Sequence, residues 1–128
     1  MERFLRLQKK KQRNKKHLHI MDTQIEKKKV FLAASTIEYA QGGIVSKEFV
    51  KTDKGGVTLF AFDCGQRLSE HSAPFDALVQ VMEGKASISI DGQEFVVSKG
   101  EMIIIPANHP HAVMAKERFK MMLTMIKG

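Results

Sequence analysis

Two blocks between residues 65 and 115 constrain the fold of this chain more than any other feature. The first block reads GQRLSEHSAPFDALVQVMEG and the second reads GEMIIIPANHPHAV. Each combines a turn glycine, a loop that contains histidine, and an apolar run of β-forming residues. The fold and any chemistry of the chain are therefore expected to depend on these two blocks.

The sequence around the blocks is a succession of short strands and turns. Alternating or β-branched runs predict strands at 44–51, 57–63, 77–82, 85–90, 93–97, 102–105, 111–115 and 119–126. Asp91-Gly92 is the two-residue hairpin signal. Gly55-Gly56 is expected in a turn and His71 in a loop, while residues 29–40 fit either a short strand or one turn of helix. Short strands at this spacing, with no long helix, predict a β-sandwich or barrel.

Two of the predicted strands are too apolar to have one face exposed to solvent. They are MIII at 102–105 and MMLTMI at 121–126. A second sheet or a second subunit is expected to cover them. The eight methionines of the chain are interpreted as adaptable core residues rather than ligands.

The net charge of +7 comes entirely from the N-terminus. Residues 1–20 hold eight Lys or Arg and one Glu, whereas residues 21–128 hold thirteen basic and thirteen acidic residues. Residues 1–20 are therefore predicted to be a disordered basic arm, or an overextended start, before a single domain at 21–128. The arm, which includes His17 and His19, is the one place where nucleic acid or an anionic membrane could bind. The neutral domain gives no such indication.

The sequence contains no membrane or disulfide signature. No apolar run approaches the roughly 20 residues of a membrane span, and the basic N-terminus lacks the hydrophobic run of a secretory signal. Cys64 is the single cysteine and is interpreted as a structural thiol. A cytoplasmic protein with no membrane partner is expected.

The two blocks resemble the motifs of small single-domain cupins of the RmlC-like type. The matching positions are Gly65, His71, Gly84, Gly100, Pro106 and His111. The resemblance implies an all-β, cupin-type double-stranded β-helix, a jelly-roll barrel, over about residues 56–126. It also implies a homodimer, because small cupins commonly dimerise through sheet edges and an N-terminal strand.

The resemblance implies a reduced metal site. In cupins two histidines and a glutamate of the first motif, with one histidine of the second, bind a divalent metal inside the barrel. In this chain Ala73 and Ala77 replace the second histidine and the glutamate. A catalytic metal site usually has three protein ligands, and His71 and His111 alone would hold an ion weakly. The sequence therefore favours a barrel without a tightly bound catalytic metal.

The alternative metal site recruits replacement ligands. His109 lies two residues before His111 and would share its face in an extended strand. Asp76, Glu70 and Cys64 are weaker candidates. A site of His71, His111 and His109 would suit Zn, Ni, Cu or Fe.

The remaining positions of the blocks suggest a pocket for a small molecule. Alternation predicts that the following residues face the barrel interior with the two histidines: Ala73, Ala77, Val79, Val81, Val113 and Ala115. An apolar cavity with two polar groups is typical of a ligand site. Alternatively, larger neighbours fill the space beside the alanines and the histidines only bond loop carbonyls.

The function predicted from the sequence is small-molecule binding in the barrel, with no assigned catalytic residue. The histidines are suited to general acid–base chemistry near neutral pH, but no carboxylate partner is evident. One alternative is a metal-dependent enzyme of the dioxygenase or isomerase type. Another is a regulatory protein whose basic arm binds nucleic acid. No residue identifies a substrate or ligand.

Overall fold

The computed structural model describes residues 25–127, and the predicted basic arm at residues 1–20 lies outside this range. One turn of 3-10 helix, η2 (Ala33–Ser35), precedes the strands. The nine strands are β1 (Ile44–Thr52), β2 (Gly55–Phe62), β3 (Arg67–His71), β4 (Asp76–Glu83), β5 (Lys85–Ile90), β6 (Gln93–Ser98), β7 (Met102–Ile105), β8 (His111–Met114) and β9 (Phe119–Ile126). In this part of the chain no helix is long and apolar enough to cross a membrane.

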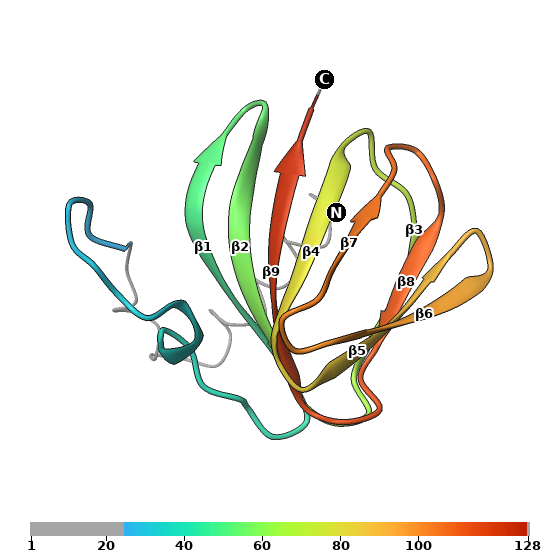
Figure 1. Cartoon of the computed structure of the whole chain (residues 1–128), viewed down its shortest axis with the longest axis horizontal. Coiled ribbons are helices and arrows are strands. Elements are labelled where there is room, and N and C mark those ends of the chain that lie inside the picture. The colour runs from blue at the N-terminus through green and yellow to red at the C-terminus, as the bar shows by residue number, and fades with distance from the viewer. Residues whose placement is uncertain (1–24, 128) are drawn as a thin grey trace.

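The strands form two antiparallel sheets that face each other (Figure 1). The five-stranded sheet has the order β1-β2-β9-β4-β7 and the four-stranded sheet the order β3-β8-β5-β6. Several neighbours in the sheets are distant in the sequence, as in the pairing of β2 with β9 and of β5 with β8. The prediction of an all-β, two-sheet barrel is confirmed.

The inner faces of the sheets enclose one apolar core. Phe60, Phe62 and Phe119 are fully buried in it, and the rings of Phe62 and Phe119 stack with their centroids 4.5 Å apart. Burial of each ring contributes about 1.5–3 kcal/mol to folding. The stacked pair joins β2 to β9 across the middle of the five-stranded sheet.

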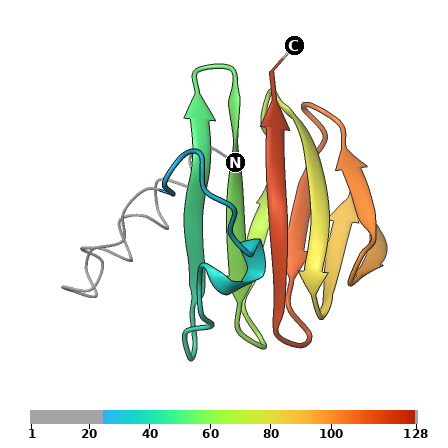
Figure 2. The same cartoon turned by 60° about the vertical axis from the view of Figure 1, so that its left-hand side comes forward.

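The opposite face of the five-stranded sheet carries a second, smaller core. Leu59 and Ala61 alternate with the phenylalanines of β2 and pack against Ile37, because successive side chains of a strand point to opposite faces. The segment around η2 lies across the outer face of β1 and β2 (Figure 2). Residues 29–40, for which the sequence left a strand or a helical turn open, therefore contain one helical turn within a covering segment.

Lys120 binds the covering segment to the five-stranded sheet through hydrogen bonds. Its buried ammonium donates hydrogen bonds to the carbonyl oxygens of Ala34 and Ile37, at 2.6 and 2.9 Å. The hydroxyl of Tyr39 donates to Glu83 at 2.8 Å. These contacts hold residues 34–39 of the covering segment against the sheet.

Two predictions about turns and loops were wrong. Residues 67–71 form strand β3 rather than a loop, and only Leu68 among them is buried, so its apolar pattern is weak. Gly55 and Gly56 belong to β2, and the turn is at residues 53–54. A Cβ on Gly55 would lie 1.9 Å from the carbonyl oxygen of Met125, so glycine is needed for the close approach of β2 to β9.

Candidate functional site

The two motif histidines lie side by side on neighbouring strands of the four-stranded sheet. His71 ends β3 and His111 begins β8, and the two residues are paired in the sheet register. Their ring centroids are 4.4 Å apart with an interplanar angle of 61°. The antiparallel pairing of β3 with β8 thus brings the two sequence blocks together.

Backbone carbonyls fix the orientation of both rings. Nδ1 of His71 lies 2.8 Å from the oxygen of Ser69, and Nδ1 of His111 lies 2.9 Å from the oxygen of His109. A carbonyl oxygen only accepts, so in the neutral rings each Nδ1 carries the proton and each Nε2 is an acceptor. Both Nε2 atoms are buried, and that of His111 has no hydrogen-bond partner within residues 25–127.

Burial keeps the imidazoles neutral. Loss of solvation lowers the pKa of His71 and of His111 below the ordinary value of 6.5, against the smaller opposing effect of the carbonyl contacts. The neighbouring His71 lowers the pKa of His111 further. A neutral imidazole can accept a hydrogen bond or bind a metal ion, whereas a protonated one can do neither.

The six residues predicted to line a pocket are all buried in the inner core: Ala73, Ala77, Val79, Val81, Val113 and Ala115. Three of them alternate along β4, with outward residues between them. The same core contains Phe60 and Met121. That these small residues line a ligand cavity stays a prediction.

The structure places His109 apart from the paired histidines. Its Nδ1 lies 2.6 Å from a carboxylate oxygen of Asp91, in the turn between β5 and β6, and both side chains are about half exposed. Asn108 has a φ of 68°, so the chain turns before β8 begins. The period-two argument that grouped His109 with His111 does not apply to a turn.

Two of the other candidate ligands, Asp76 and Cys64, have contacts elsewhere. Asp76 accepts a hydrogen bond from the amide of Ala107 at 2.9 Å, and the exposed thiol of Cys64 contacts the carbonyl oxygen of Lys116. Across residues 25–127 no three His, Cys, Asp or Glu side chains lie close enough to hold a metal ion. Two imidazoles are thus the donor set of the described site, and they do not fit a catalytic metal held by three protein ligands.

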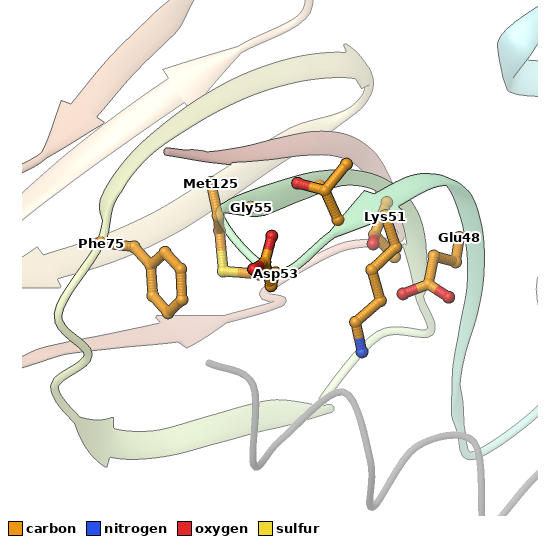
Figure 3. Close-up of a pocket in the computed structure, with 9 residues that line it drawn as sticks. Glu48, Lys51, Asp53, Gly55, Phe75 and Met125 are labelled. Atoms are coloured by element: carbon orange, nitrogen blue, oxygen red, sulfur yellow. The ribbon is translucent and has the colours of Figure 1, made fainter. Parts of the chain in front are cut away.

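A shallow hollow lies at another point of the barrel (Figure 3). It occupies about 330 Å³, including space open to solvent, between the β1–β2 hairpin and the inner core. Phe75 and Met125 form its apolar side, and Glu48 and Lys51 are among its polar residues. Sequence analysis did not single it out, because its lining comes from three separated segments with no shared motif.

The fold and the paired histidines define a class: small two-sheet barrels with imidazoles on adjoining strands of one sheet. The family model of the cupin domain matches residues 58–127. The chain therefore belongs to the cupin family, as the motif resemblance implied. No curated protein sequence matches it.

Solved structures agree with this assignment. A conserved Streptococcus pyogenes protein of unknown function is 36% identical with a TM-score of 0.78, over 81% of this chain and 91% of that one. A cupin superfamily protein from Desulfitobacterium hafniense is 27% identical with a TM-score of 0.76, over 81% and 95% of the two chains. A cupin 2 conserved barrel domain protein from Leptotrichia buccalis is 44% identical with a TM-score of 0.72, over 73% of this chain and 46% of its own length.

Proposed function

We propose that this cupin binds a small organic molecule that donates a hydrogen bond, from a hydroxyl or N–H group, to Nε2 of His111. The main observation in support of the proposal is the burial and hydrogen bonding of the His111 imidazole. It is 3% exposed, its Nδ1 is engaged by a carbonyl, and its Nε2 lacks a partner among the described residues. A buried polar atom without a partner costs about 1–3 kcal/mol, which a donor on the ligand would recover.

His71 supplies a second oriented acceptor beside the first. Its ring is held by the Ser69 carbonyl and adjoins that of His111. The inner core of the barrel is apolar and includes alanine and valine of β4 and β8, the strand that His111 begins. These features favour a mostly apolar ligand with one or two donor groups. The proposal assigns no catalytic residue. It includes a cytoplasmic location, where the exposed thiol of Cys64 would stay reduced.

A divalent metal is the second candidate ligand. Metal-binding histidines usually donate their other ring N–H to a carbonyl or carboxylate, and both rings have this arrangement. His71 and His111 would hold the ion, with oxygen atoms of a bound organic ligand completing the shell. Such a site would suit Zn, Ni, Cu or Fe, but an enzyme of the dioxygenase or isomerase type would need a third protein ligand, which residues 25–127 do not bring to the two histidines. Nucleic-acid binding by residues 1–20 is a separate prediction. A salt titration of nucleic-acid binding, which compares the full chain with the chain lacking these residues, tests it.

Two matched histidine variants test the proposed function. Untagged full-length protein is screened by thermal shift against phenols, hydroxy acids, sugars and amides, and separately against Zn²⁺ and Ni²⁺. Compounds that raise the melting temperature of the parent should also raise that of His109→Asn but not that of His111→Asn. Compounds that stabilise all three proteins equally would bind elsewhere and would contradict the proposed site.

A further inference from the structure

The shallow hollow lies at the same end of the barrel as the paired histidines (Figure 1). Strand β3 ends at His71, and only residues 72–75 separate it from the start of β4 at Asp76. The register of the five-stranded sheet places Ile126, at the end of β9, opposite both Asp76 and Gly55. Gly55 is part of the lining of the hollow, so the strand ends that carry the site and those that form the hollow meet at one rim.

Phe75 belongs both to the inner core and to the lining of the hollow. Its side chain is 8% exposed and is part of the same core as Ala73 and Val113. With Met125 it forms the apolar side of the hollow (Figure 3). The backbone of Met125 is paired with strands on both sides, whereas Phe75 belongs to the loop between β3 and β4. Phe75 is therefore the apolar residue of the hollow whose backbone lies outside the sheets.

Hydrogen bonds hold the backbone on both sides of Phe75. The carbonyl oxygen of Ala73 accepts from the amide of Asn108 at 2.7 Å, and the carboxylate of Asp76 accepts from the amide of Ala107 at 2.9 Å. These two contacts join the loop after β3 to the loop before β8. A change in the shape of the hollow is therefore expected from a new rotamer of the Phe75 side chain rather than from displacement of the loop.

The ring of Phe75 keeps the hollow small. Much of the hollow is open to solvent, and its enclosed part has room for little more than a water molecule. The ammonium of Lys127 lies 6.0 Å from the centroid of the Phe75 ring, at the limit of a cation–π attraction that favours this position of the ring. An organic molecule fits between the hollow and the inner core only when the ring turns aside.

The polar groups around this path favour a neutral ligand. Glu48 and Asp53 bring carboxylates to the hollow, beside the ammonium of Lys51. At the inner end, Nε2 of His111 is a hydrogen-bond acceptor. An organic anion would bring a further acceptor to this nitrogen and would bury a charge. A phenol or an alcohol supplies the donor without either cost.

We propose that Phe75 limits the size of the ligand. A neutral, single-ring phenol or alcohol enters through the hollow, turns the Phe75 ring aside and donates its hydroxyl to Nε2 of His111. This inference rests on the proposed function, because His111 is the group that holds the ligand. Phe75 is then a specificity-determining residue that contacts the apolar body of the ligand, and a smaller side chain at this position would admit molecules with two fused rings.

Phenol and 2-naphthol provide the test, because each has one hydroxyl and they differ by one ring. Isothermal titration calorimetry of the untagged full chain should show tighter binding of phenol than of 2-naphthol. Phe75→Ala should lower the ratio of the 2-naphthol to the phenol dissociation constant roughly tenfold. Phe75→Leu should shift the ratio in the same direction and serves as the second variant if circular dichroism shows that Phe75→Ala is unfolded. The matched control is Phe95→Ala, which truncates a ring packed against the inner core but outside the lining of the hollow and should keep the parent ratio.

The failure of this inference can be distinguished from that of the proposed function. Phenol binding that is absent from the parent, or equal in the parent and in His111→Asn, would contradict the proposed function and the role of Phe75 with it. Phenol binding that depends on His111, with the parent ratio retained by each folded variant of Phe75, would overturn only the role of Phe75. An equal change of the ratio in Phe95→Ala would also overturn it.

Discussion

His109 and His111 are separated by one proline but have opposite environments. His111 is buried, and its Nε2 has no hydrogen-bond partner among residues 25–127, whereas His109 is exposed and paired with Asp91. The sequence NHPH does not distinguish them, because the difference arises from where β8 begins and from its pairing with β3. The motif resemblance identified His111, whereas the geometric argument for His109 depended on an extended backbone that the structure does not have there.

The ring chemistry of the site can be observed directly. Nitrogen NMR of the imidazoles at pH 7 should show His71 and His111 as neutral Nδ1–H tautomers, because both Nδ1 atoms face carbonyl oxygens. His109→Asn should remove one imidazole signal and leave those of His71 and His111 unchanged. Charged rings, or the Nε2–H tautomer at either residue, would contradict the proposed acceptor role.

The lowered pKa of His111 predicts a pH dependence of stability. In the unfolded chain this ring takes up a proton near pH 6.5, while in the folded chain it does so only at lower pH. The free energy of unfolding is therefore greatest above about pH 6.5 and falls as the pH decreases toward the folded pKa. Urea unfolding of His111→Asn should show a shallower decrease between pH 7 and 5 than the parent, and parallel curves would argue against a depressed pKa.

At the scale of elements, the covering segment depends on one buried cation. Lys120→Met would leave the carbonyl oxygens of Ala34 and Ile37 without their donor, so we expect a loss of about 2 kcal/mol in the free energy of unfolding. Faster proteolysis before β1 should accompany it. The control is Lys116→Met, which removes an exposed ion pair with Glu94 and should change stability by about 0.5 kcal/mol or less. Equal effects of the two substitutions would contradict this role of Lys120.

The elements that sequence predicted best have a strong local pattern. The β5–β6 hairpin follows from the alternation of KASISI and from Asp91-Gly92, whose φ angles of 53° and 82° match the turn that this dipeptide favours. By contrast, β3 contains one buried residue in five, and its pairing with β8 is its reason to be extended. The long-range pairing of β3 with β8 also assembles the histidine site. The local sequence pattern therefore predicted neither the strand β3 nor the contact between the two histidines.

At the scale of the whole molecule, the five-stranded sheet is apolar on both faces. The sequence predicted that residues 102–105 and 121–126 would be covered on both faces by a second sheet or a second subunit. The four-stranded sheet provides the cover on the inner face. On β9, Met121, Leu123 and Met125 pack into the inner core. The covering segment shields the outer faces of β1 and β2, and hydrogen bonds join it to Lys120 of β9.

The central claim is that the paired histidines form a site for a small organic molecule rather than a tightly held metal centre. Elemental analysis of untagged, full-length protein after gel filtration tests it most directly. With two imidazoles as the protein donors, we expect far less than one Zn, Ni, Cu or Fe per chain. Close to one metal per chain in the parent, and none in the His71→Ala/His111→Ala double variant, would contradict the claim.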